Sequence, residues 1–192
     1  MIPLDWQNVR PIISSQEEYE WFDHIASDHY SNLGRDLLSL EIGSYCGQTS
    51  VLLAQYGPVF AIDLWGDVHN GLGHMSNIGQ VNFVPFIQNI IRYDLVERVF
   101  PIVSTSAVLD KLPQMAFDII YVDAAHYYEP AKLDIDRSKR HLAPNGLLVC
   151  HDYKRPGDAA HIGVNRAVDE FLESGEFKIK EHFKGLVVLE RI

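Results

Sequence analysis

The chain has 192 residues, a length that suits one domain with a substantial buried core. Its formal net charge of -10 disfavours nucleic-acid and anionic membrane partners, because Lys and Arg make most of those contacts. No apolar run approaches the roughly 20 residues that span a bilayer, and residues 1–10 lack the pattern of a secretory signal. Two cysteines, Cys46 and Cys150, are too few for a disulfide framework and indicate reduced thiols in a cytoplasmic protein.

Strand and helix patterns alternate along the chain. Ser15, with Glu18 three residues later, forms a capping-box pattern and predicts that a helix begins there. Continuous apolar runs predict strands over residues 37–43, 59–65, 98–104, 117–123 and 146–153. Helical patterns cover residues 48–56, 83–91, 106–112, 130–142 and 164–172, and a glycine-rich loop covers 66–80. Residues 177–183 and 186–192 have the pattern of a terminal hairpin.

Repeated alternation of strand and helix predicts parallel strands with right-handed crossovers, in a doubly wound α/β sheet. We expect a single domain over 1–192, with an N-terminal helical extension over 1–34 and the α/β core over 35–192. Such sheets bind ligands beyond the carboxyl ends of their strands. The candidate site residues are therefore the polar ones at those ends, namely Glu41, Asp63, Ser104 to Ser106, Asp123, His151 and Asp152.

The turn after the first strand contains Gly43 and Gly47. Glycine allows a tight turn and close approach of a ligand to the main chain. Tyr45 stands where a dinucleotide fingerprint has its middle glycine, which disfavours a pyrophosphate. Asp63, at the end of the second strand, is where an acid accepts hydrogen bonds from ribose hydroxyls. We favour a ribose-bearing ligand; the alternative is a plain turn with Asp63 as a capping acid.

Five stretches occur in this order: EIGSYCGQTS, AIDLW, SAVLDKLP, FDIIYVDAAHYYEPAKLDI and LAPNGLLVCHDY. Together they resemble class I S-adenosylmethionine-dependent methyltransferases over residues 37–190. The resemblance is closest to small O-methyltransferases whose fourth strand ends in D-G-D-H-x-Y-E and whose fifth ends in H-D-Y. It implies a Rossmann-like sheet of seven strands in the order 3-2-1-4-5-7-6, with strand 7 antiparallel and helices on both faces.

The resemblance implies S-adenosylmethionine as the cofactor. The implied contacts are Glu41, Gly43 and Ser44 at the methionine end, Asp63 at the ribose, Leu64 and Trp65 beside the adenosine, and Ser104, Thr105 and Ser106 near the adenine. Many relatives carry an acid in that last loop, where this chain has none. Gly47 is expected to be a packing glycine where the helix starts.

Asp123 and Asp152 end neighbouring strands, and two such carboxylates repel, share a proton or hold a cation. Oxygen ligands suit magnesium, and the resemblance to metal-dependent catechol-type enzymes implies Mg²⁺ or Mn²⁺ on Asp123, Asp152 and, as a candidate, His151. The cation would acidify and orient a substrate hydroxyl. His151 is alternatively a second base or a supporting hydrogen-bond partner. Asp123 alternatively caps the turn or contacts the amino group of the cofactor.

His126 follows Asp123 by three residues, where the resembled enzymes carry a lysine base. Histidine accepts a proton near neutral pH, so we assign catalysis to His126 together with Asp123. The alternative is a loop histidine packed beside Tyr127. Ala125 replaces an acid of the family pattern, which leaves one expected carboxylate missing.

These residues predict O-methylation of a small-molecule hydroxyl, on a sugar or a phenol, assisted by a divalent metal. Ala125 suggests one alternative, an S-adenosylmethionine-binding protein without methyl transfer. The other alternative is a nucleotide-binding oxidoreductase domain, which Tyr45 disfavours. The aromatic segment YEWF, over 19–22, can pack on a second copy as well as on its own sheet, so a homodimer stays open.

Overall fold

The computed structural model describes residues 15–65, 79–154 and 162–192. Its helices are α1 (Gln16–Leu33), α2 (Gln48–Leu53), α3 (Gly79–Arg92), the short 3-10 helix η2 (Ser106–Lys111), α4 (Tyr128–His141) and α5 (Ile162–Glu173). Its strands are β1 (Ser39–Ile42), β2 (Val59–Asp63), β3 (Val99–Val103), β4 (Phe117–Val122), β5 (Leu142–Cys150), β6 (Phe177–Phe183) and β7 (Leu186–Arg191).

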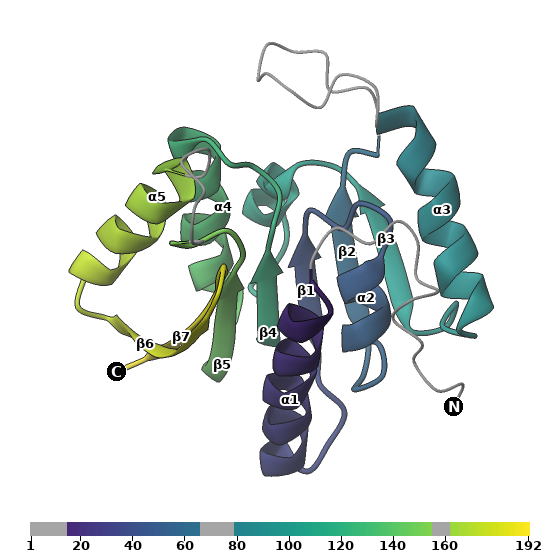
Figure 1. Ribbon diagram of the computed structural model, residues 1–192, viewed down its shortest axis with the longest axis horizontal. Coiled ribbons are helices and arrows are strands. Elements are labelled where there is room, and N and C mark those ends of the chain that lie inside the picture. Colours follow the sequence, from purple (N-terminus) through teal and green to yellow (C-terminus); the bar gives the residue numbers. More distant parts are fainter. Residues whose placement is uncertain (1–14, 66–78, 155–161) are drawn as a thin grey trace.

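All seven strands form one sheet in the order β3-β2-β1-β4-β5-β7-β6 (Figure 1). Strands β1 to β5 pair in parallel, whereas β7 is antiparallel to both β5 and β6. This confirms the predicted seven-stranded, Rossmann-like sheet. Parallel pairing puts the carboxyl ends of β1, β2, β4 and β5 at the same edge, which is the upper edge in Figure 1.

Helices cover both faces of the sheet, and each face has its own hydrophobic cluster. Side chains of α1, α2 and α3 pack against one face, with Phe22, Leu52 and Phe86 among the most buried. Side chains of η2, α4 and α5 pack against the other face. Successive strand residues point to opposite faces, so continuous apolar runs such as β4 supply both clusters, and the core holds the strand ends in place.

Helix α1 begins with the predicted capping box, in which Ser15 and Glu18 exchange hydrogen bonds. Phe22 is buried against Tyr121 of β4, with ring centroids 5.1 Å apart. Trp21 stacks on Phe183 of β6 at 5.6 Å. The aromatic segment therefore packs on its own sheet, while the homodimer stays a prediction. Throughout the described ranges, each helix is too short or too polar to cross a membrane.

Two local expectations differ from the structure. Helix α4 begins at Tyr128, two residues before Pro130, which a first turn tolerates because its N–H groups have no helical partner. Leu142, the last residue of the predicted helix over 130–142, instead starts β5, and the pairing of β4 with β5 shifts register between Phe117 and Ile119. The predicted loop over 66–80 lies outside the described residues except for the start of α3.

A buried aspartate ties the end of α1 to the sheet. The Asp118 carboxylate in β4 accepts two hydrogen bonds from the Arg35 guanidinium, at 2.7 and 2.8 Å, and one from the Leu38 amide at 2.9 Å. These bonds outweigh the effect of burial and lower the pKa of Asp118. The contact fixes the chain between α1 and β1.

We expect Asp118→Ala to lower the free energy of unfolding by about 1–3 kcal/mol, because it leaves a buried amide and a cation without their acceptor. Urea unfolding at neutral pH measures the change. The matched control is Asp136→Ala, which removes an exposed pair with Lys132 and should cost less than about 0.5 kcal/mol. Equal losses in the two variants would contradict the structural role of Asp118.

Candidate active site

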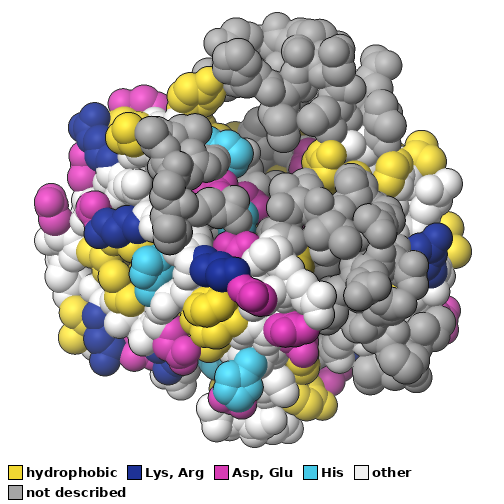
Figure 2. All heavy atoms as spheres, in the orientation of Figure 1, with side chains coloured by type: hydrophobic (Ala, Val, Ile, Leu, Met, Phe, Trp, Pro, Cys, Tyr) yellow, Lys and Arg dark blue, Asp and Glu magenta, His cyan; other side chains and the backbone are white. Residues whose placement is uncertain are grey.

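Backbone hydrogen bonds join the strand ends into one continuous edge. Each amide just after a strand donates to a carbonyl at the end of its neighbour, at 2.8–3.0 Å: Ser104 to Asp63, Gly43 to Ile62, Asp123 to Ile42, and His151 to Val122. The predicted acids and histidines therefore lie along the same edge of the sheet. Figure 2 shows acidic and histidine side chains close together in the upper middle part of the molecular surface that faces the viewer.

The turn after β1 requires glycine at Gly43 for a reason beyond ligand access. Its φ is 91°, and a Cβ placed there would lie 2.1 Å from the carbonyl oxygen of Asp123. Gly43 thus lets the ends of β1 and β4 approach each other. At Gly47 a Cβ would lie 2.8 Å from the ring of Phe86, which fits the packing role expected of that glycine.

Asp63 is oriented by the backbone on both sides of it. One carboxylate oxygen accepts from the amide of Tyr45 and the other from the amide of Trp65, each at 2.8 Å. A carboxylate offers about four lone-pair sites, so both oxygens keep capacity for further donors.

The two residues after Asp63 differ in their exposure. Trp65 is buried, packs against Phe83 and Phe86 with centroids 5.1 and 4.7 Å away, and donates its indole N–H to the carbonyl of Tyr45 at 2.7 Å. Leu64 is 38% exposed. Both residues were predicted to lie beside the adenosine. Leu64 faces outward, whereas the buried Trp65 supports the glycine turn through its bond to Tyr45.

Two polar residues of α3, which the sequence analysis missed, hold this turn. Asn89 donates its side-chain amide to the carbonyl of Cys46 at 2.9 Å, and the Cys46 thiol lies 3.7 Å from the side-chain oxygen of Asn82. Both asparagines are buried. The sequence could have pointed to them, because Asn82 and Asn89 are seven residues apart on the same helix face as Phe86. A polar residue on an apolar face needs a hydrogen-bond partner.

We expect Asn89→Leu to lower the free energy of unfolding by about 1–3 kcal/mol, because the carbonyl of Cys46 would stay buried without a donor. Thermal and urea unfolding measure this loss. Gln88→Leu changes the neighbouring, exposed position of α3 and should stay within about 0.5 kcal/mol of the parent. A variant Asn89→Leu as stable as Gln88→Leu would show that the bond does not hold the turn.

Glu41 and Ser44, both predicted at the methionine end of a cofactor, are buried behind the turn. The Ser50 hydroxyl of α2 donates to the Glu41 carboxylate. Burial raises the pKa of Glu41 to about 8, although its bond to Ser50 acts in the opposite direction. At neutral pH this carboxyl therefore carries its proton, and it faces α2 instead of the open edge.

The buried Glu41 makes stability depend on pH. The folded state keeps a proton that the unfolded chain releases above pH 4.5, so the contribution to stability is complete below pH 4.5 and is lost as pH rises towards about 8. We expect the free energy of unfolding of Glu41→Gln, relative to that of the parent, to rise by about 1 kcal/mol per pH unit across that window. Urea unfolding at several pH values, with the exposed Glu20→Gln as control, tests it; a difference independent of pH would contradict the account.

The three residues predicted near the adenine have different roles. Ser104 donates its amide to the Asp63 carbonyl. The Thr105 hydroxyl caps η2 by accepting from the amide of Ala107 at 3.3 Å. Ser106 is buried and donates to Asp134 of α4. The Ser106 hydroxyl therefore ties η2 to α4, and the more exposed Ser104 and Thr105 are the ones that border the edge.

A chain of alternating carboxylates and imidazoles lies at the ends of β4 and β5. The His126 Nε2 is 3.1 Å from one oxygen of Asp152, and the Nδ1 of His151 is 3.4 Å from the other. The same Nδ1 is 3.2 Å from Asp123. The side chain of His151 is only 3% exposed, whereas that of His126 is 41% exposed. His126 is thus the histidine that can meet a ligand.

The pKa values in this chain follow from its pairing. Burial opposes a charge on His151, but the Asp123 and Asp152 carboxylates outweigh it and raise the pKa of His151 to about 10. Burial likewise opposes a charge on Asp152, yet its bonds to His126 and His151 hold its pKa well below the usual range. The bond to Asp152 raises the pKa of His126. His151 therefore acts as a fixed cation between two carboxylates.

The backbone that carries Asp152 is strained and firmly held. Asp152 and Lys154 adopt φ values of 63° and 47°, in the left-handed region that non-glycine residues rarely use. The amide of Tyr153 donates to Gly185 at 3.0 Å, and that of Lys154 donates to Asn165 of α5 at 2.5 Å. Such strain is typical of functional sites, and the Asp152 side chain lies 3.1 Å from His126.

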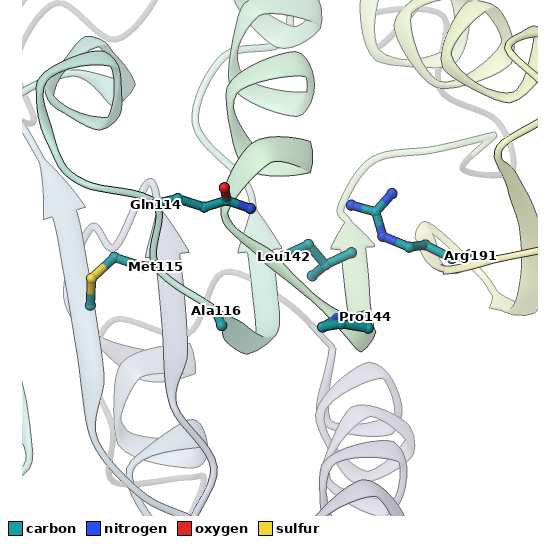
Figure 3. A pocket seen from close by; sticks show the side chains of 6 residues that line it. All are labelled: Gln114, Met115, Ala116, Leu142, Pro144 and Arg191. Carbon is teal, nitrogen blue, oxygen red and sulfur yellow. The ribbon is translucent and has the colours of Figure 1, made fainter.

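A surface cavity of about 420 Å³ lies at the other edge of the sheet. Figure 3 shows the side chains around it, which come from the segment just before β4, the start of β5 and the end of β7: Gln114, Met115, Ala116, Leu142, Pro144 and Arg191. The Arg191 guanidinium donates to the carbonyl of Lys139 and stacks on Phe177. This cavity contains none of the predicted site residues.

Comparisons with known proteins agree with this arrangement. Residues 40–153 match a family model described as a methyltransferase domain. An uncharacterized protein of Acanthamoeba polyphaga mimivirus is 30% identical over 125 residues, which are 62% of this chain and 52% of that protein. The chain thus spans about half the length of this curated relative.

Two solved structures share the fold at low identity. An O-methyltransferase from Bacillus cereus, in complex with S-adenosylhomocysteine, has a TM-score of 0.71 and 14% identity, covering 100% of this chain and 93% of its own. The O-methyltransferase TomG from Streptomyces achromogenes, involved in tomaymycin synthesis and in complex with S-adenosylmethionine, has a TM-score of 0.67 and 15% identity, covering 95% and 82%.

The family match covers more than half of the chain and defines the class of the protein: the chain belongs to the methyltransferase domain family. The match extends from β1 to the HDY motif and so includes Asp63, Asp123 and Asp152. The resemblance noted in the sequence is therefore confirmed at the level of the family.

Proposed function

We propose that this protein transfers a methyl group from S-adenosylmethionine to a hydroxyl oxygen of a small molecule, with His126 as the base. The observation that carries the proposal is the contact of His126 with Asp152, 3.1 Å long, at the same edge as the glycine turn and Asp63. Membership of the methyltransferase domain family supports the reaction class.

The cofactor supplies an electrophilic methyl group on a sulfonium. Asp63 has two oriented oxygens with spare acceptor capacity, which suits the two ribose hydroxyls. The Gly43 turn brings main-chain groups to the edge, and Leu64 offers an exposed apolar surface for the adenosine. Complexes of the Bacillus and Streptomyces O-methyltransferases with S-adenosylhomocysteine and S-adenosylmethionine support this choice of cofactor.

His126 is suited to take the proton of the acceptor hydroxyl. Its Nε2 lies 3.1 Å from a carboxylate oxygen of Asp152, so Asp152 orients the ring and can hold a proton that the imidazole takes up. Protonation then creates an imidazolium that Asp152 stabilises, and the raised pKa of His126 expresses this preference. A base oriented by a carboxylate contributes about 10²–10⁴-fold in rate.

A divalent cation is the second candidate for activating the hydroxyl. Asp123, His126 and Asp152 each offer one ligand atom within 4.8 Å of the others, which fits a small metal ion. Bound there, Mg²⁺ or Mn²⁺ would lower the pKa of the acceptor hydroxyl. Among the three candidate metal ligands, we now propose His126 as the histidine, whereas the sequence suggested His151. The Nδ1 of His151 contacts both carboxylates.

A sugar or phenol hydroxyl is the acceptor class that we propose. The Streptomyces neighbour acts in the synthesis of a small molecule, tomaymycin, which supports an acceptor of that size. The formal charge of -10 disfavours nucleic acid as the acceptor.

Formation of S-adenosylhomocysteine with a panel of catechols and sugars tests the proposal. We expect His126→Ala to lower the rate about 100-fold or more without changing cofactor affinity. The rate of the parent should rise with pH through an inflection above 6.5, since only neutral His126 accepts the proton. Asp152→Asn should move that inflection down towards 6.5, and asparagine tolerates the positive φ at this position.

The matched control is His24→Ala, which removes the exposed contact of His24 with Asp28 on α1 and should leave the rate unchanged. Full activity in His126→Ala would refute the role of the base. Tight cofactor binding without product on any acceptor would instead favour a binding protein. A rate that EDTA abolishes and Mg²⁺ or Mn²⁺ restores would support the cation site, whereas an EDTA-resistant rate would assign activation to His126 and Asp152 alone.

A further inference from the structure

We infer that Gly163, in the first turn of α5, is a positioning residue that sets the distance between α5 and the loop carrying His126. The inference rests on the proposed role of His126 as the base. Gly163 itself lies on the helix that packs beside α4 (Figure 1).

The backbone of the His126 loop lies directly against Gly163. A Cβ on Gly163 would be 2.4 Å from the carbonyl oxygen of His126, 2.4 Å from the amide nitrogen of Tyr128 and 2.7 Å from the carbonyl carbon of Tyr127. Real Cβ atoms essentially never come within 3.0 Å of such atoms. Because all three are backbone atoms, no side-chain rotation relieves the clash, and either the helix or the loop must move.

Contacts on either side hold the two ends of the loop. On the α4 side, the Tyr128 hydroxyl donates to Glu170 of α5 at 2.5 Å, and the Arg166 guanidinium lies 3.8 Å from the Tyr128 ring. On the β4 side, the amide of Asp123 is bonded to Ile42. The loop is thus held at both ends, and a displacement falls on the residues between, which include His126.

A small displacement is enough to separate His126 from Asp152. Their contact is 3.1 Å, and a hydrogen bond is lost at about 3.6 Å. Bringing the closest contacts of a Cβ on Gly163 from 2.4 Å to 3.0 Å requires a movement of at least about 0.6 Å, which exceeds the tolerance of the bond. Asp152 is held separately from this loop, because the amide of Tyr153 bonds to Gly185 and that of Lys154 bonds to Asn165 of α5. Gly163 therefore allows α5 to support the base at bonding distance.

The test compares Gly163→Ala with Gly175→Ala. Gly175 follows the other end of α5 and has a φ of 71°, and a Cβ placed on it would meet no heavy atom within 4 Å. Its substitution therefore strains the backbone without touching His126. Both proteins are labelled with ¹³C-histidine, and the imidazole resonance of His126 is assigned by its loss in His126→Ala. Binding of S-adenosylhomocysteine is measured by calorimetry, and the methyl-transfer rate is measured on the same samples.

We expect Gly163→Ala to shift the His126 resonance and to lower the rate about tenfold or more, within the 10²-fold range of a 1 Å misplacement, with cofactor affinity within about twofold of the parent. Gly175→Ala should lose stability but keep the parent resonance and rate. An unchanged His126 resonance in folded Gly163→Ala would overturn the inference.

If Gly163→Ala does not fold, Glu170→Ala replaces it, because it releases the Tyr128 hydroxyl that clamps the loop to α5. A shifted His126 resonance in that variant supports the inference, and an unshifted one overturns it. The resonance needs no methyl transfer, so failure of the proposed reaction and failure of the positioning role give different results.

Discussion

His151 allows two carboxylates to share one end of the sheet. Asp123 and Asp152 belong to neighbouring parallel strands, and like charges brought together in a partly buried place normally force one of them to take a proton. The buried Nδ1 of His151 lies within 3.4 Å of both, so its positive charge offsets theirs. Asp152 then stays ionised and can hold His126. The contact between Asp152 and His126 depends on this neighbouring imidazole.

The sheet supplies the constraint that makes the charge effective. The hydrogen bonds that continue past the strand ends place Asp63, Gly43, Asp123 and His151 in a row. Positive φ values at Tyr45, Trp65, Asp152 and Lys154 show that the loops above this edge are strained. Such strain persists only where surrounding contacts impose it, and here buried side chains of α3 and the contacts of α5 impose it.

Much of this arrangement could be predicted because it follows from local pattern. Continuous apolar runs located the strands, and parallel pairing then required Asp63, Asp123 and Asp152 to meet at one edge. The features that could not be predicted depend on atoms far apart in the chain. Gly43 is needed because of the carbonyl of Asp123 just after β4, and Asn89 acts on a loop that α3 reaches only in the folded state. Trp65 and Leu64 are adjacent, yet only the fold decides which of them is buried.

A crystal structure with S-adenosylhomocysteine bound tests the central claim most directly. We expect the ribose at Asp63 and the thioether sulfur turned towards His126, with His151 still between Asp123 and Asp152. A ligand seated at the opposite edge, in the cavity beside Arg191, would contradict it. A ligand at the predicted edge with its sulfur facing away from His126 would contradict it as well.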